Sequence, residues 1–325
     1  MPALLDIQDL AVAFHGEKGS VSVLNGVSFT LEAGETLGIV GESGSGKTVL
    51  VRAILGLLQS PWRVERGKVV YAGNDLVGKD EDALQRIRGK EIALTTPEPR
   101  KHLNPLLTIG EQIVNVVQAH SQIPRKAALA RAAELLTAVG IPDPKARLQA
   151  YPHELSGGMC QRVVIAMALV HSAKLLLADE PTAGLDVTIS RQILDLMHDL
   201  VRDFNSALVL VSRDLGVIAH YCQRVAVMYA GQVVEIAKVP AFFAKAAHPY
   251  SRHLIRAAAA ARDSAQAKAA VRAAAVTGAG CAFARRCPLV VPPCAERMPD
   301  IEPVAEAHWA RCLRRHEIAA GAVTA

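Results

Sequence analysis

Eight consecutive residues, 41–48, carry the clearest chemical signal in the chain. They read Gly-Glu-Ser-Gly-Ser-Gly-Lys-Thr, which is the pattern GxxxxGKT between an apolar run and a helical pattern. Glycines let backbone N–H groups close around phosphate oxygens, and the start of a helix adds positive potential. Lys47 would reach the β- and γ-phosphates, and the Thr48 hydroxyl would bind Mg²⁺. The residues expected at the phosphates are Gly41, Ser43, Gly44, Ser45, Gly46, Lys47 and Thr48.

An acidic pair follows a second apolar run, at residues 175–178. There, Asp179 and Glu180 stand where a buried strand is expected to end. We expect Asp179 to hold Mg²⁺ through water and Glu180 to polarise the attacking water as a general base. The alternative interpretation is an acidic pair that caps a surface turn before Pro181.

A second candidate anion-binding site lies at Ser156, Gly157 and Gly158. The serine hydroxyl and the backbone N–H groups of the two glycines are expected at the start of a helix. One nucleotide does not need two such sites on one chain. We therefore expect this one to face the γ-phosphate of a nucleotide that a second subunit holds. That arrangement predicts a head-to-tail dimer with two composite sites.

Four cysteines gather near the end of the chain: Cys281, Cys287, Cys294 and Cys312. No pair has the CxxC spacing of common zinc sites. Prolines between them favour tight loops that can gather thiolates. The pattern is compatible with Cys₄ ligation of a [4Fe-4S] cluster or of Zn²⁺, and with free thiols.

Other tail residues and the two remaining cysteines receive simpler interpretations. Cys160 and Cys222 have no companions and are expected in the core. His308 is expected to be solvent-exposed, with a role as a fifth ligand as the alternative. The tail arginines are expected to form a solvated rim, with contact to anionic lipid as the alternative; they are Arg285, Arg286, Arg311, Arg314 and Arg315.

The elements that must position these residues alternate between strand and helix. Residues 4–14 and 21–32 show the period-two pattern of half-buried antiparallel strands, and residues 35–41 form a buried strand. An Ala-rich, basic stretch at 255–276 predicts a surface helix or tether. Helices are predicted over 47–58, 80–87, twice within 109–140, and over 158–171, 187–204 and 214–221. Strands are predicted near 68–72, 91–96, 174–179, 207–212 and 224–236.

Composition excludes several classes of protein. Of the 325 residues, 51% are hydrophobic and 21% are charged, which excludes a disordered or fibrous chain. Aromatic residues at 4% and a net charge of +5 argue against a nucleic-acid partner. No apolar run is long enough to span a bilayer, and no secretory signal is visible at the start. We expect a cytosolic chain.

The three motifs, in the chain order 41–48, 155–159 and 179–180, resemble those of the ATP-binding subunits of ABC transporters. The resemblance covers residues 4–240. Leu-Ser-Gly-Gly-Met at 155–159, followed by Gln161 and Arg162, is the most specific piece. The resemblance implies that Phe14 stacks on adenine and that Asp186, in the loop 183–186, links two halves of a dimer. It also implies an α/β P-loop NTPase fold with a RecA-like core, an antiparallel β-subdomain and a helical subdomain at about 98–165.

The tail is similar to that of oligopeptide and dipeptide importer ATPases. His248-Pro249-Tyr250, Leu-Asn-Pro at 103–105 and the Cys-rich run at 280–312 carry this similarity. It implies an ATP-binding domain over 1–245 and a C-terminal extension over 246–325 that holds a [4Fe-4S] cluster. The alternatives are an importer of nickel, opines or glutathione, and an ABC ATPase outside transport.

The same resemblance implies a set of cofactors and partners. The chain would be an ATPase that uses ATP and Mg²⁺ to drive translocation, peripheral to the cytoplasmic face of a bacterial inner membrane. Its partners would be a second ABC ATPase, two transmembrane permeases and, indirectly, an extracytoplasmic substrate-binding protein.

Two residues depart from the family pattern. Pro97 stands where a glutamine is expected, and it has neither an amide side chain nor a backbone N–H. Arg213 stands where a histidine is expected, and it cannot accept a hydrogen bond from water. We expect an asymmetric pair of sites, in which the site on Lys47 binds ATP but hydrolyses it poorly. The alternative is that Arg213 and water restore ordinary turnover.

Overall fold

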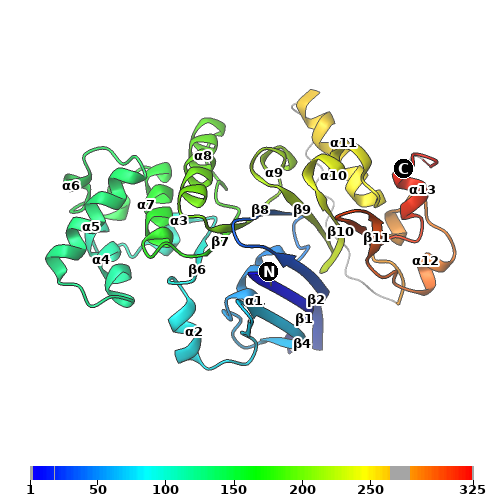
Figure 1. The fold of residues 1–325 in the computed structure, drawn as a ribbon, viewed down its shortest axis with the longest axis horizontal. Helices are drawn as coiled ribbons and strands as arrows, with labels where there is room; N and C mark the ends of the chain where they lie inside the picture. The colour runs from blue at the N-terminus through cyan, green and yellow to red at the C-terminus, as the bar shows by residue number, and fades with distance from the viewer. Residues whose placement is uncertain (1–2, 18, 264–278, 324–325) are drawn as a thin grey trace. The chain divides into compact units, whose positions relative to one another are not determined.

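The structure is a computed structural model that describes residues 3–17, 19–263 and 279–323. The chain divides into two compact units (Figure 1). The first comprises Met1–Glu32, Thr36–Val77 and Leu210–Ala325, and the second comprises Ala33–Glu35 and Gly78–Val209. Of the predicted helix or tether over 255–276, the part from residue 264 onward lies outside the described residues.

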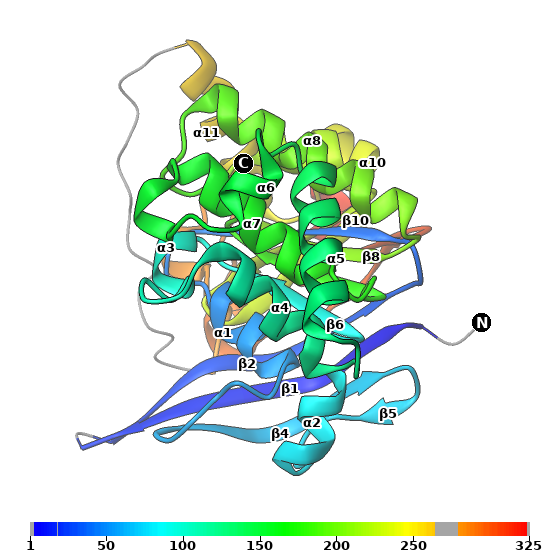
Figure 2. The same cartoon turned by 90° about the vertical axis from the view of Figure 1, so that its left-hand side faces the viewer.

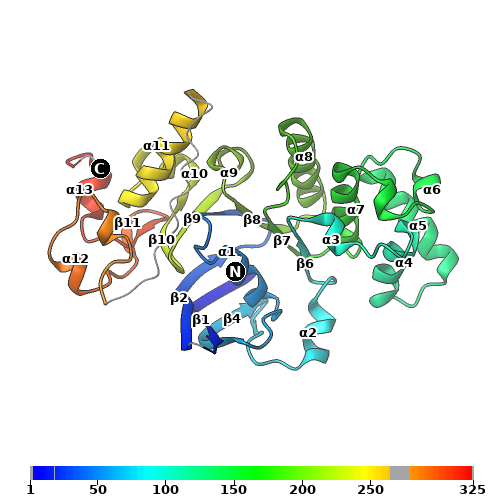
Figure 3. The same cartoon turned by 180° about the vertical axis from the view of Figure 1, so that it is seen from behind.

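The first unit contains an antiparallel sheet of order β2-β1-β4-β5, of which Figure 3 labels β2, β1 and β4. Leu5 pairs with Leu31 on one side and with Tyr71 on the other, and all three side chains are buried. The two antiparallel strands predicted near the start of the chain are confirmed. The strands are β1 (Leu5–Gly16), β2 (Gly19–Leu31), β4 (Trp62–Tyr71) and β5 (Asn74–Asp75).

A second sheet in the first unit positions residues 41–48. All five residues of β3 (Thr36–Val40) are buried, as expected for a strand covered on both faces. This strand runs parallel to β9 (Arg224–Tyr229), which pairs antiparallel with β10 (Gln232–Lys238). Helix α1 (Lys47–Ile54) follows β3 and ends four residues earlier than predicted. It ends there because Gly56 adopts a φ of 62°, which does not continue a helix.

The C-terminal tail extends this second sheet. Strand β12 (His308–Ala310) pairs antiparallel with β10, and β11 (Glu302–Ala305) pairs with β12. The sequence pattern did not predict these two strands. The helices of the first unit are α1, α9 (Leu215–Tyr221), α10 (Val239–Lys245), α11 (Pro249–Asp263), α12 (Pro293–Glu296) and α13 (Arg315–Ala319).

The second unit has a parallel strand pair and a group of helices. Strand β6 (Ile92–Thr95) runs parallel to β7 (Leu175–Asp179), as the apolar runs predicted. Strand β8 (Ala207–Ser212) begins in this unit and ends in the first. Helices α4, α5 and α7 pack on one another (Figure 2). The helices are α2 (Glu81–Ile87), α3 (Pro99–His102), α4 (Ile109–Ala119), α5 (Arg125–Ala138), α6 (Pro144–Arg147), α7 (Gly157–Leu169) and α8 (Val187–Asp203).

Two side-chain predictions concern the core. Cys160 and Cys222 are both buried, which confirms their expected place.

Among the residues that the structure describes, no helix combines the length and the apolar character needed to cross a membrane.

Candidate functional site

Residues 41–46 form a tight loop between β3 and α1. A Cβ atom on Gly41 would lie 2.2 Å from the carbonyl oxygen of Met228, and one on Gly46 would lie 2.7 Å from the Leu24 side chain. Gly46 also has a φ of 100° at the start of α1. Only glycine fits at these two positions, so the loop keeps its backbone close to β9 and β2.

The Lys47 side chain folds across this loop. Its Nζ donates hydrogen bonds to the carbonyl oxygens of Gly41 at 2.8 Å and Glu42 at 3.0 Å, and to Ser45 Oγ at 3.4 Å. Lys47 is 5% exposed, whereas Ser43, Gly44 and Thr48 are exposed. A buried ammonium held at an open glycine loop is an anion-binding device, because phosphate oxygens are stronger partners for it than carbonyl oxygens.

The acidic pair lies at the end of β7 in the second unit. Asp179 is 4% exposed, and Glu180 follows it with a φ of 44°. A left-handed backbone at a residue other than glycine costs energy, and such residues cluster at functional sites. The turn is fixed by a hydrogen bond from the Ala183 N–H to the Glu180 carbonyl oxygen, at 3.0 Å.

The second candidate anion-binding site lies at the exposed start of α7, also in the second unit. Ser156 is the N-cap, and its Oγ accepts a hydrogen bond from the Met159 N–H at 3.3 Å. A Cβ on Gly158 would lie 2.8 Å from the Ile189 side chain, so the glycine is required by the approach of α8. Asp186 caps α8 and accepts from the Ile189 N–H at 3.0 Å. These local caps are those that the residue types predict.

The two departures from the family pattern lie in different units. Pro97 follows β6 in the second unit and is partly buried, beside Thr95 and Thr96, whose buried hydroxyls have no hydrogen-bond partner. Arg213 lies in the first unit and lines a cavity of about 650 Å³ with residues of α9, α10 and α11. The turn at Arg213 is held by Asp214, which caps α9 and accepts from the Gly216 N–H at 2.7 Å.

Phe14 lies half-buried on β1, opposite Trp62 of β4. The two rings meet edge to face, with centroids 5.1 Å apart. Sequence reasoning did not include Trp62. The signal that could have found it is the antiparallel pairing of the two strands, which places the two aromatic residues opposite each other.

The four tail cysteines line one small cavity in the first unit. They share this cavity with His248 and Phe283, among others. Burial raises the pKa of the Cys281 and Cys287 thiols, and raises that of Cys312 to about 12. Across the described ranges, no three His, Cys, Asp or Glu side chains are arranged to hold a metal ion. The described residues therefore show neither a [4Fe-4S] cluster site nor a Zn²⁺ site.

Two expectations for the tail are wrong. His308 is 2% exposed rather than solvated, and its Nε2 lies 2.7 Å from Glu235 Oε1. The tail arginines are not a uniform solvated rim, because Arg286 and Arg311 are partly buried and bonded. Arg311 donates to the carbonyl oxygens of Val233 and Pro299. His308 lies on β12 and Arg311 follows it directly, so the pairing of β12 with β10 places both beside β10.

Comparison with known proteins agrees with these features. Residues 24–183 match the family model described as ABC transporter, and residues 234–294 match the oligopeptide/dipeptide transporter C-terminal region. The chain is 43% identical over 321 residues to a probable peptide ABC transporter ATP-binding protein of Sinorhizobium fredii, covering 97% of this chain and 96% of that protein. It is 49% identical over 253 residues to the oligopeptide transport ATP-binding protein OppD of Bacillus subtilis, covering 78% of this chain and 71% of that protein.

Solved structures show the same fold. The ATP-binding cassette MJ0796, solved as a dimer in a post-hydrolysis state with ADP and Pi, aligns with a TM-score of 0.65 and 26% identity. The alignment covers 72% of this chain and 98% of the cassette.

Proposed function

The chain belongs to the ATP-binding subunits of ABC transporters, with the C-terminal region of the oligopeptide/dipeptide type, and we propose that it energises the import of peptides. The predicted P-loop NTPase fold and the ATPase class are confirmed by this membership. Peptide cargo is supported by the names of the relatives in Sinorhizobium fredii and Bacillus subtilis.

The observation that carries nucleotide binding is the buried Lys47 ammonium on the carbonyl oxygens of its own loop. When a triphosphate binds, its charged oxygens replace the carbonyl oxygens as hydrogen-bond acceptors for this ammonium. The backbone N–H groups of the loop then bind the β- and γ-phosphates. Asp179 and Thr48 offer the hard oxygen ligands that suit Mg²⁺. Mg²⁺ held by these two side chains would supply positive charge at the phosphates. Glu180 takes the proton of the attacking water.

The site at Ser156, Gly157 and Gly158 serves a nucleotide held by a second ABC ATPase. Its support is the exposed N-cap Ser156 at the start of α7, which belongs to a different unit from Lys47. Asp186 belongs to the loop that communicates between the two sites. Phe14 supplies the ring that stacks on adenine.

The two sites of such a pair turn over unequally. Pro97 has no side-chain amide and Arg213 has no hydrogen-bond acceptor with which to position water at the Lys47 site, and losing one such group costs about 10²–10⁴-fold in rate. The test is Glu180→Gln in the purified complex. Most ATPase activity should remain, because the partner's nucleotide supplies the turnover, and near-complete loss of activity would refute the asymmetry.

The four cysteines of the extension hold a [4Fe-4S] cluster. The support is that four soft thiol donors line a single cavity. Four cysteines are the ligand set that a [4Fe-4S] cluster takes. The purified protein should be brown and contain iron, and a colourless protein free of iron would end this part of the proposal.

The chain associates peripherally with the cytoplasmic face of a bacterial inner membrane through two transmembrane permeases. An extracytoplasmic binding protein delivers the peptide to them. The finding that no described helix could span a bilayer agrees with this arrangement. Co-purification with two polytopic subunits tests it, and recovery without any membrane protein under mild solubilisation would contradict it.

A further inference from the structure

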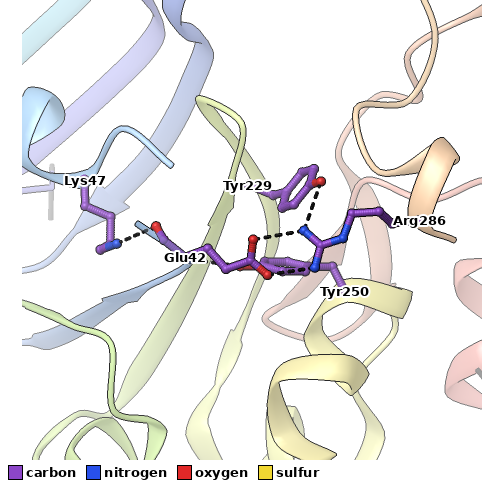
Figure 4. Close-up of polar contacts among 5 residues, drawn as sticks. All are labelled: Glu42, Lys47, Tyr229, Tyr250 and Arg286. Atoms are coloured by element: carbon purple, nitrogen blue, oxygen red, sulfur yellow. Dashed lines mark hydrogen bonds and ion pairs between the residues drawn. The ribbon is translucent and has the colours of Figure 1, made fainter. Parts of the chain in front are cut away.

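Glu42, in the phosphate-binding loop, is paired with the C-terminal extension. Arg286 Nη1 donates to Glu42 Oε2 and Arg286 Nη2 donates to Glu42 Oε1, both at 2.9 Å (Figure 4). The two side chains are 24% and 18% exposed. A bidentate pair at this depth fixes both the position and the direction of the carboxylate.

The backbone of Glu42 is held by the extension as well. Its N–H donates to the Tyr250 hydroxyl at 2.9 Å, and Tyr250 is fully buried at the start of α11. Its carbonyl oxygen accepts the hydrogen bond from Lys47 Nζ. One loop residue therefore connects the phosphate-binding ammonium to two residues of the extension.

A cluster of three aromatic side chains keeps Arg286 in place. Its guanidinium lies 5.7 Å from the Tyr229 ring centroid and 5.6 Å from that of Phe283, and Nη1 lies 3.4 Å from the Tyr229 hydroxyl. The rings of Tyr229, Tyr250 and Phe283 pack against one another, with centroids 4.6 to 5.5 Å apart. Stacking and packing restrict the arginine rotamer, so the ion pair forms at little further entropic cost.

Charge gives this arrangement a consequence for nucleotide binding. A carboxylate inside an anion-binding loop repels a triphosphate, and Arg286 both neutralises it and draws it toward the extension. A loop that is already fixed also loses less conformational entropy when the phosphates arrive. Both effects favour the bound state.

We propose that Arg286 and Tyr250 are positioning residues that clamp the phosphate-binding loop in its nucleotide-binding shape through Glu42. The C-terminal extension thereby sets the affinity of the loop for nucleotide. The proposal rests on nucleotide binding at Lys47 and is independent of the unequal turnover proposed above.

The test measures the Kd of the full chain for a fluorescent Mg²⁺–ATP analogue. Arg286→Gln should raise Kd at least about tenfold, since a charged hydrogen bond contributes roughly 1.5–3 kcal/mol and each 1.4 kcal/mol is tenfold. The matched control is Arg285→Gln, the exposed neighbour, which should stay within about twofold of the wild type. Tyr250→Phe keeps the packed ring and should raise Kd about fivefold, because a neutral hydrogen bond contributes about 1 kcal/mol and each 1.4 kcal/mol is tenfold.

A charge rescue separates the clamp from a general loss of structure. In the double variant Glu42→Gln with Arg286→Gln, the repelling carboxylate is gone but the loop stays unclamped, so Kd should recover only in part, to about threefold above the wild type. Thermal unfolding shows whether each variant is folded. The clamp is overturned if Arg286→Gln binds like Arg285→Gln, or if the double variant regains the affinity of the wild type, because Arg286 would then act only by neutralising the charge of Glu42. Wild-type protein that binds no nucleotide would instead contradict the proposed function.

Discussion

Arg286 donates a hydrogen bond to each carboxylate oxygen of Glu42 at 2.9 Å, although 244 positions separate the two residues. The pair joins the Cys-rich extension to the loop that carries Lys47 within the first unit. Because Cys287 follows Arg286 directly and Phe283 lines the thiol cavity, the same segment serves the clamp and the cysteine site. The extension is therefore structurally part of the nucleotide-binding unit.

Replacing Lys47 by glutamine should abolish nucleotide binding. The variant loses the ammonium that contacts Gly41, Glu42 and Ser45 and that would contact phosphate oxygens. We expect Kd for Mg²⁺–ATP to rise at least about 100-fold, measured by equilibrium titration. Lys68→Gln removes an exposed lysine of β4 and serves as the control. Equal affinities of the two variants would place the phosphates elsewhere.

Restoring the glutamine and the histidine of the family pattern at positions 97 and 213 should increase the rate of ATP hydrolysis at the Lys47 site. Pro97→Gln with Arg213→His supplies an amide and an imidazole that can position water. The measurement uses a complex in which the partner ATPase carries a glutamine in place of its own catalytic glutamate, so that only this site turns over. We expect at least a tenfold rise in phosphate release. An unchanged rate would mean that neither residue limits hydrolysis.

Cys222 should lower stability at alkaline pH. Burial raises its thiol pKa from 9.0 to about 12. The folded state therefore keeps a proton that the unfolded chain releases, so the contribution to stability is complete below pH 9 and is lost as the pH rises toward 12. The free energy of unfolding should fall by up to about 1.4 kcal/mol per pH unit in that window. Urea unfolding of Cys222→Ala should show a free energy of unfolding that falls less steeply with pH than that of the wild type. Equal slopes for the two proteins would contradict the raised pKa of Cys222.

Cys287→Ser should weaken nucleotide binding through Arg286. We expect Kd to rise about threefold, since contacting residues couple by roughly 0.5–3 kcal/mol. The same substitution in the Arg286→Gln background should leave Kd unchanged, because the clamp is already lost. A rise of equal size in both backgrounds would show that the cysteine site acts by another route. Nucleotide titration of the four proteins completes the cycle.

Local pattern determined much of the site. The glycines and lysine at 41–48, the cap at Ser156 and the cap at Asp186 depend on neighbours within a few positions, so residue type and spacing suffice to predict them. The predicted alternation of strands and helices was confirmed for the same reason, since a buried strand such as β3 is a continuous apolar run.

Tertiary structure decided what the tail does. Strands β11 and β12 are too short to show a period, and only their pairing with β10 makes them strands. Because His308 is polar, we predicted that its side chain would be exposed to solvent. It is instead buried, and its Nε2 contacts Glu235 Oε1. The choice of Glu42 as the partner of Arg286 could not be read from either residue. A charge has no preferred partner along the chain, and only the folded backbone determines which opposite charge lies within reach.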